Sequence, residues 1–510
     1  MAMLKRMESG SNVEHGRRHF TGFSIFCIFF MGLGSMSYGY PAAIIGTTLG
    51  QPSFLTYMGL DTATNASQLI GAITALFYAG GLVGSFCHGW MSNRFGRKAS
   101  ILGGALMVLI SGALLTASVN VGMFIVFRFF NGWGAFQPLC TVPLWVTEIA
   151  PPTRRGMLVD IHAVMLNLGY VVAGYIGLGF YFYSGGNQWR GPMALQMLFP
   201  FILICGLWWM PESPRWLLSK DRADEARAVV QRLHVNPTDP NDHFAEDEFD
   251  QMRRQIELDR TFKTSYKEIF TRPSYRKRAL ITMILTYSLM SSGVLVINRF
   301  GTLDVLLFLT GWTSCAFVFN IVAIAFVDRV PRNRLIALGF FVCTCTLVVE
   351  AALQANFLNS NNKGALGAAV AMTCLYVVSY SLFLDGPTYF YIGEIWPTHL
   401  RAQGYSLGLG MLCLTQIVWS QAAPTAFATI GWTYYIFFVI FAALGCVASL
   451  LLFPDTLHKP LEETAAMFGD EEEVVTFQRY AAGKGGLEGV SNEKPPVTDC
   501  ERTQDVANAY

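Results

Sequence analysis

The stretch PESPRWLLSK, Pro211–Lys220, separates two hydrophobic parts of the chain. It directly follows the apolar run FILICGLWWM, Phe201–Met210, and it opens a long polar segment inside the sequence. An apolar run closed by Pro-x-x-Pro and then by charged residues is typical of a helix that leaves a lipid bilayer. We therefore predict that this stretch is the junction between two membrane-embedded halves.

The composition supports a polytopic membrane protein. Of the 510 residues, 53% are hydrophobic and only 14% are charged, whereas soluble proteins carry about 25% charged residues. A net charge of +1 gives no argument for nucleic acid as a partner. The 11 cysteines are scattered and show no metal-binding spacing. No nucleophile constellation or phosphate-binding loop is evident either, so we expect no enzyme activity, metal or cofactor.

About twelve apolar runs are long enough to span a bilayer, with six on each side of the junction. The polar segment between them has amphipathic helical patterns, which favour a small helical domain. The predicted divisions are a cytoplasmic N-terminal tail (1–19), an N-terminal six-helix bundle (20–210), a cytoplasmic helical linker (211–277), a C-terminal six-helix bundle (278–453) and a cytoplasmic, largely disordered C-terminal tail (454–510).

Lys and Arg set the expected orientation. They cluster before the first apolar run and after the second, fourth, eighth and tenth, whereas the alternate loops are nearly bare. By the positive-inside rule both termini are cytoplasmic, as expected for a multi-pass protein of the cell membrane. The sequon Asn65-Ala66-Ser67 then falls in the first outer loop, and we expect Asn65 to be a glycosylation acceptor.

Two sequence blocks recur in both halves. GWMSNRFGRK (Gly89–Lys98) pairs with VDRVPRNR (Val327–Arg334), each after the second helix of its half. WVTEIAPPTRRG (Trp145–Gly156) pairs with YIGEIWPTHLRAQG (Tyr391–Gly404), each after the fourth helix. A six-plus-six repeat is the signature of a transporter whose binding site lies at the bilayer midplane between the halves.

The chain resembles the sugar porter family of the major facilitator superfamily over about residues 20–470. The resemblance rests on six blocks in the right order: NRFGRK, PLWVTEIAPPTRRG, WRGPMALQ, PESPRWL, GEIWPTHLRAQG and PDTLHKPLEE. It implies an all-α membrane protein with the major facilitator fold: 12 transmembrane helices in two six-helix bundles and a cytoplasmic helical linker. It also implies alternating access. The late blocks are similar to those of fungal members.

The resemblance further implies a charge network at the cytoplasmic helix ends. Carboxylates and guanidiniums there can pair when the inner side is shut. The alternative is that these groups are ordinary solvated helix ends and topology signals. The network residues are Arg97, Glu148, Arg155, Glu212, Arg215, Arg329, Glu394 and Arg401.

The expected hexose site departs from the family pattern. Ala163 stands where the family usually has a glutamine on helix 5, and Leu289 and Met290 stand at the two glutamines of helix 7. The Asn-Trp pair of helix 11 is lost near Leu412 and Cys413. A sugar requires many fixed hydrogen bonds. The fold therefore carries over, whereas the family's hexose site does not.

Other polar residues remain inside the predicted helices. Asp385 lies nine residues before Glu394, about 13 Å deeper at helical rise. An ionisable group near mid-membrane is a functional hypothesis by default. Asp160 lies about one turn from the cytoplasm, and we expect it to be structural. The candidate substrate-binding residues are His162, Asn167, Asn298, Asp385, Tyr389 and Gln416.

Proton coupling is the second departure. Proton-coupled members of the family carry an Asp on helix 1 that faces an Arg on helix 4. Here Pro41 stands at that position, whereas the intramembrane Arg128 remains. An arginine without its acid needs another partner. The loss favours facilitated diffusion, or coupling through a different acid.

The functional hypothesis is transmembrane transport of a sugar or polyol by a chain that is expected to act as a monomer. The apolar substitutions leave open a transporter of another small metabolite, such as an organic acid or an exported secondary metabolite. A non-transporting nutrient sensor is a third possibility, although the predicted C-terminal tail of about 55 residues is short for one.

Overall fold

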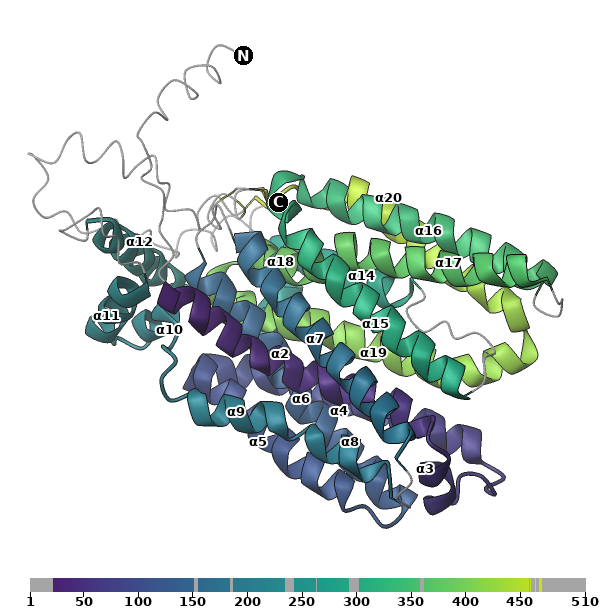
Figure 1. Cartoon of the computed structure of the whole chain (residues 1–510). Coiled ribbons are helices and arrows are strands. Elements are labelled where there is room, and N and C mark those ends of the chain that lie inside the picture. The colour runs from purple at the N-terminus through teal and green to yellow at the C-terminus, as the bar shows by residue number, and fades with distance from the viewer. Residues whose placement is uncertain are drawn as a thin grey trace, which may run out of the picture.

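The computed structural model describes residues 22–150, 155–183, 187–233, 243–262, 264–292, 302–357, 362–457, 459, 464 and 467–469. Within these residues the regular structure is helical throughout. Two helical bundles lie side by side, and a small group of helices projects from one end of the first bundle (Figure 1). Apolar helices occupy both bundles, as the hydrophobic runs of the sequence predict.

The first bundle contains five long helices and one that is broken into two short segments. The sixth rod is interrupted at Gln196–Met197, between α8 and α9. The elements are α2 (Gly22–Leu49), α3 (Pro52–Tyr57), α4 (Ala66–Phe95), α5 (Arg97–Thr116), α6 (Val121–Ile149), α7 (Arg155–Tyr181), α8 (Arg190–Leu195) and α9 (Leu198–Gly206).

The second bundle also contains six rods. Its fourth rod is a single run in which α17 continues through a π-helical turn, η3, into α18. The elements are α14 (Pro273–Met290), α15 (Thr302–Ile324), η2 (Val327–Arg329), α16 (Arg332–Phe357), α17 (Lys363–Tyr380), η3 (Ser381–Asp385), α18 (Gly386–Ile395), η4 (Thr398–Leu400), α19 (Arg401–Thr429), η5 (Gly431–Thr433) and α20 (Tyr434–Leu451).

Eight stretches of these helices are long and apolar enough to cross a membrane by themselves. The other rods are shorter or carry more polar residues, and the bundle around them covers those residues. The arrangement is that of a multi-pass membrane protein with six rods in each half.

The polar segment between the bundles folds into α10 (Pro214–Ser219), α11 (Ala223–Leu233), α12 (His243–Asp259) and α13 (Tyr266–Thr271). The amphipathic α11 buries Ala226, Val230 and Leu233, three of the apolar positions that the sequence places on one face. Trp216 and Phe249 belong to the same small core as Ala226 and Val230. We call the end of the molecule that bears α10–α12 the linker face (Figure 1).

Glycines allow the helices of the first bundle to pack closely. An ideal Cβ built on Gly80 of α4 would lie 1.8 Å from the backbone oxygen of Phe129 on α6. A Cβ on Gly132 of α6 would lie 1.8 Å from the backbone oxygen of Phe77 on α4. Each helix therefore presents a glycine to the backbone of the other, which is the usual way for membrane helices to approach.

The two bundles meet mainly along three helix pairs. Helix α7 of the first bundle packs on α15 and α18 of the second, and α4 packs on α19. The polar residues proposed from the sequence lie mainly on these helices, except Asn298, which falls in the stretch 293–301 outside the described residues.

Candidate functional site

A buried polar cluster joins the two bundles at Asp385. One of its carboxylate oxygens, Oδ2, accepts a hydrogen bond of 2.7 Å from Nδ2 of Asn167 on α7. The same oxygen accepts a bond of 3.2 Å from Nδ2 of Asn320 on α15. All three residues are buried. The two amide donors come from different bundles, so the Asp385 carboxylate ties α7 to α15 across the seam.

Asp385 ends the π-helical turn η3, Ser381–Asp385. A π-helical turn inside a longer helix is uncommon and is often found at functional sites. It changes the rotation of the residues that follow, and here Gly386 and Pro387 open the next α-helical segment. The irregular turn places the Asp385 carboxylate against α7 and α15.

His162 lies on the same helix as Asn167, and it is also buried. Its Nδ1 is 2.6 Å from Oγ of Ser35 on α2. Its ring meets the ring of Tyr389 edge-on, with the centroids 4.8 Å apart. His162 belongs to the first bundle and Tyr389 to the second, so this ring contact is a second link across the seam.

Gln416 makes a third contact between the bundles. Its Nε2 donates to the hydroxyl of Tyr78 on α4 at 3.3 Å. Tyr78, Phe77 and Phe136 form an aromatic group with Tyr38 of α2, in which the rings of Tyr38 and Phe136 are 4.9 Å apart. Aromatic rings and a few fixed polar groups are the usual lining of a small-molecule site.

Four of the positions at which the sequence departs from the hexose pattern are apolar and buried. Ala163 and Leu289 are each 1% exposed, and Leu412 and Cys413 pack in the same core cluster as Tyr38 and Tyr389. These side chains offer no hydrogen-bonding group for a sugar hydroxyl except the weak thiol. The polar groups near the seam come instead from Asn167, Asn320 and Asp385.

Arg128 is buried in the first bundle and uses a backbone partner. Its Nη1 donates a hydrogen bond of 2.9 Å to the carbonyl oxygen of Pro41. The guanidinium carbon lies 4.3 Å from the centroid of the Phe77 ring, within range of a cation–π interaction. The Pro41 carbonyl and the Phe77 ring are thus the partners of Arg128, in place of the helix 1 Asp that proton-coupled family members carry.

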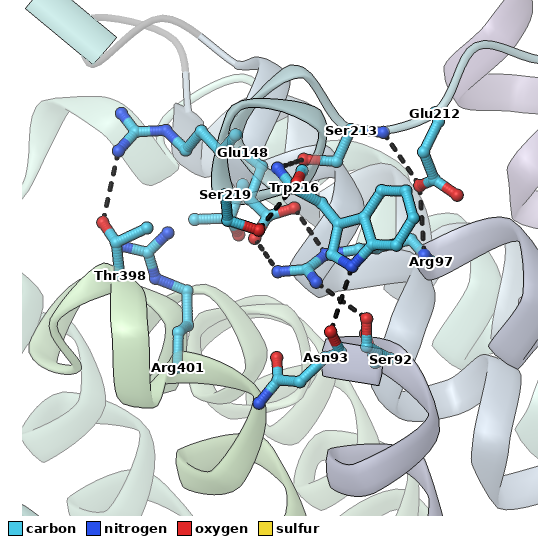
Figure 2. Close-up of polar contacts among 12 residues, drawn as sticks. Ser92, Asn93, Arg97, Glu148, Glu212, Ser213, Trp216, Ser219, Thr398 and Arg401 are labelled. Atoms are coloured by element: carbon cyan, nitrogen blue, oxygen red, sulfur yellow. Dashed lines mark hydrogen bonds and ion pairs between the residues drawn. The ribbon is translucent and has the colours of Figure 1, made fainter. Parts of the chain in front are cut away.

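Two buried charged residues of the first bundle, Arg97 and Glu148, lie at the linker face with the half-buried Glu212, which precedes α10 (Figure 2). The guanidinium of Arg97 pairs with the carboxylate of Glu148, with Nε 2.9 Å from Oε2. The carboxylate of Glu212 accepts bonds from the backbone nitrogens of Arg97 and Lys98 at 3.0 and 3.1 Å. Glu212 therefore caps the start of α5. Burial raises the pKa of Glu212, although these N–H donors act in the opposite direction.

The second bundle repeats this arrangement. Arg332 begins α16 as Arg97 begins α5, and it pairs with Glu394, Nε to Oε2, at 3.5 Å. The backbone nitrogen of Arg332 is capped by the Asp455 carboxylate at 3.0 Å, as that of Arg97 is by Glu212. The internal repeat of the sequence thus corresponds to a repeated ion pair and helix cap.

One residue of the expected network lies elsewhere. Arg329 is exposed, and Arg332 instead makes the ion pair with Glu394. The reason is local: Arg329 ends the short turn η2, whereas Arg332 starts α16 and points back toward Asp328 at 2.7 Å. The sequence block VDRVPRNR contains three arginines, and its letters alone do not distinguish them.

The two halves also touch directly at the linker face. The backbone nitrogen of Met157, on α7, donates to Asp328 of the second bundle at 2.9 Å. Arg215 of α10 donates to the hydroxyl of Thr398 at 3.2 Å, and Arg401 donates to the same hydroxyl at 3.3 Å. Arg155 is buried at the start of α7. Among the described residues, the Met157–Asp328 bond therefore joins the two bundles at the linker face, and the Arg215–Thr398 bond joins the linker to the second bundle.

Comparison with known proteins identifies the family to which this chain belongs. A family model described as "Sugar (and other) transporter" matches residues 27–468. The chain belongs to this sugar transporter family. A relative in the family, the MFS-type transporter criB of Aspergillus cristatus, is 30% identical over 460 residues, covering 88% of this chain and 94% of the relative. The high-affinity glucose transporter of Kluyveromyces lactis is 26% identical over 480 residues, covering 88% and 86%.

The fold of this family member is that of the major facilitator superfamily. The structure of the proton:xylose symporter XylE bound to 6-bromo-6-deoxy-D-glucose superposes with a TM-score of 0.76 at 21% identity, covering 88% of this chain and 100% of that chain. The twelve rods are therefore the 12 transmembrane helices of two six-helix bundles, as the sequence predicts.

Sequence reasoning missed Asn320 and Arg332. Asn320 is a single amide in the otherwise apolar run of α15, which is the signal that could have drawn attention to it. Arg332 was one of several arginines in a basic loop. In both cases the sequence does not show which side of the helix faces the rest of the protein, and this decides whether the side chain meets a polar partner.

Proposed function

We propose that this chain transports a sugar or polyol across the cell membrane by alternating access. The observation that carries the proposal is the hydrogen bond between Asn167 and Asp385, which joins the two bundles at a buried polar cluster. In two-halved transporters the substrate site lies between the halves near the bilayer midplane. A solute bound at this seam would be exposed to one side or the other as the bundles rock.

The polar groups at the seam suit a hydroxylated solute. Asp385 offers acceptors, the amides of Asn167 and Asn320 offer donors and acceptors, and Tyr389 offers an aromatic face beside His162. Sugar recognition requires such fixed hydrogen bonds together with an aromatic surface. His162, Tyr389 and Gln416 complete the set within the described residues, and Asn298 remains a candidate from the sequence.

The linker face is proposed to be cytoplasmic, with both termini on that side. The basic residues of the sequence cluster in the loops that lie there, in agreement with the positive-inside rule. Separation of the bundles at that face would break the contacts of Asp328 and Thr398, while Arg97–Glu148 and Arg332–Glu394 would hold each half together. This network would control access from the cytoplasm.

A second candidate is transport of a less polar metabolite. The buried positions Ala163, Leu289, Leu412 and Cys413 are apolar where a hexose site needs hydrogen-bonding side chains. A ligand with more apolar surface would fit such a site better. The two candidates differ in substrate and share the site, so one uptake experiment separates them.

The experiment is uptake of labelled hexoses, pentoses, disaccharides and polyols by yeast that lack their own hexose carriers. Wild type is compared with Asp385→Asn, which keeps the shape and removes the charge, and with Glu350→Gln as a buried-carboxyl control on α16. We expect wild type and the control to take up a sugar or polyol, and Asp385→Asn to lose most uptake while reaching the membrane. Wild type that reaches the membrane and takes up none of these solutes would reject the sugar proposal.

A further inference from the structure

Asp160 is a buried acid with no hydrogen-bond partner among the described residues. It lies on α7, its relative exposure is 0%, and neither carboxylate oxygen has a donor there. An ionised carboxylate in such a place would lose its hydration without compensation, so the neutral, protonated form is favoured. The sequence led us to expect a structural role near a helix end, and the lack of a hydrogen-bond donor in the described part of the chain argues against that.

The Asp160 carboxyl lies at the seam between the bundles. An ideal Cβ on Gly386 of α18 would fall only 1.4 Å from Oδ1 of Asp160, so a side chain at that position would force the Asp160 carboxyl to move. The carboxyl of the first bundle is thus pressed against the backbone of the second. Any movement that separates α7 from α18 would uncover it to water.

Three charged side chains act on Asp160. Asp385 and Asp328 act on it with the same sign, and Arg332 acts with the opposite sign. The charge of Arg332 is already shared, because its guanidinium pairs with Asp328 at 2.7 Å and with Glu394 at 3.5 Å.

Asp385 and Asp160 therefore have different environments. Asp385 accepts hydrogen bonds from Asn167 and Asn320, which stabilise its carboxylate. Asp160 has no such donors within the described part of the chain. The two carboxyls thus differ in their hydrogen bonding, since Asp385 is held by two amide donors and Asp160 is held by none among the described residues.

We propose that Asp160 carries the coupling proton of this transporter, an inference that rests on the proposed function. While the linker face is closed, the proton stays on the Asp160 carboxyl. When α7 separates from α18, water reaches the carboxyl, its O–H bond breaks, and the proton passes to water and leaves the carboxylate. Asp385 is the neighbouring carboxylate through which a proton returns from the opposite side. In this proposal Asp160 takes the role of the helix 1 Asp of proton-coupled family members, a position that Pro41 occupies in this chain.

The test compares net accumulation with exchange for wild type, Asp160→Asn and the control Glu350→Gln. Accumulation of the substrate found by the uptake screen is measured at about pH 5.5 and about pH 7.5, with and without a protonophore. Counterflow between preloaded and external substrate needs no net proton movement. We expect Asp160→Asn to lose accumulation by roughly tenfold while counterflow stays within about twofold of wild type. The control should retain both.

Two results would overturn the proposal. One is accumulation by Asp160→Asn that equals wild type and keeps its sensitivity to the protonophore. The other is wild-type uptake that depends on neither pH nor the protonophore. Absence of any wild-type uptake would be a failure of the proposed function instead.

If wild type shows no uptake, Asp160 can still be tested by a measurement that needs no substrate. A carboxyl that holds its proton more tightly in the folded state than in the unfolded state stabilises the fold at low pH. This stabilisation is lost as the pH rises. The melting temperature of purified wild type should therefore fall more steeply with rising pH than that of Asp160→Asn. Equal pH dependence in the two proteins would show that Asp160 does not bind the proton.

Discussion

The guanidinium of Arg128 donates its hydrogen bond to the carbonyl oxygen of Pro41, 87 residues earlier in the chain, at 2.9 Å. The arginine is only 1% exposed, so it sits inside the first bundle with a backbone acceptor and the ring of Phe77. The acid that proton-coupled members of the family would place at position 41 is replaced by a carbonyl. A carbonyl stabilises the cation but cannot exchange a proton with it, so a proton carrier must be sought elsewhere.

Replacement of Arg128 by Met should change stability little. The burial of an incompletely compensated charge is costly, and an apolar side chain of similar length removes that cost together with the favourable contacts. We expect the free energy of unfolding to change by less than about 1.5 kcal/mol. The melting temperature of the purified protein in detergent checks this. A loss of about 3–5 kcal/mol would instead indicate a strong ionic partner.

The buried pair Arg97–Glu148 should behave in the opposite way. Its side chains are 6% and 0% exposed, so Glu148→Gln leaves a guanidinium without its counter-charge. The expected cost is about 3–5 kcal/mol. The matched control is Glu257→Gln, which removes the exposed pair with Arg253, in which the side chains are 59% and 58% exposed. That change should cost no more than about 0.5 kcal/mol.

A double-mutant cycle at Arg97 and Glu148 isolates the pair. If the two residues act on each other, the loss from Arg97→Met with Glu148→Gln will be much smaller than the sum of the two single losses. Additive losses in melting temperature would argue that each side chain stabilises the protein through other contacts.

Close helix packing gives a prediction with a clean control. Gly132→Ala should destabilise the first bundle by about 1–3 kcal/mol or more, because the new Cβ would meet the backbone oxygen of Phe77. Gly311→Ala, on α15, has nothing within 4 Å of the new Cβ. It should be neutral or stabilise by up to about 1 kcal/mol, since alanine favours a helix. Equal melting temperatures for the two variants would disprove the close approach.

Asn65 tests the orientation. It is exposed and sits directly before α4, at the end of the molecule opposite the linker face. If that end faces the outside, expression in yeast should attach a glycan, and Asn65→Gln should lower the apparent mass to that of enzymatically deglycosylated wild type. The control is Asn362→Gln, which is also exposed but lies outside any Asn-x-Ser/Thr sequence. A wild-type band that endoglycosidase does not shift would count against glycosylation.

Much of the architecture could be predicted from the sequence. The junction at Pro211–Lys220, the six apolar runs on each side and the amphipathic α11 all depend on local composition and periodicity. A helix must be apolar over a fixed length to cross a bilayer, and a water-facing helix must be apolar along one stripe. These constraints appear in the sequence as the length and the spacing of its apolar runs.

The candidate site could be predicted only in part. Asp385, Asn167 and His162 were recognisable as polar residues in apolar runs, because such residues are costly in a membrane. Their partners were not. Asn167 and Asp385 are 218 residues apart, and the π-helical turn that orients Asp385 leaves no pattern that we could read. The choice of Arg332 over Arg329 likewise depends on a turn of three residues.

The sequence alone determined that this chain crosses the membrane many times, in two related halves joined by a helical linker. The cause is that hydrophobic length, charge position and repeat spacing are properties of the chain itself. Only the tertiary structure decided that Asp160 has no hydrogen-bond donor among the described residues and lies against Gly386 of the other bundle. The environment of a buried acid depends on which helices meet and how they are rotated, and the amino-acid sequence alone shows neither.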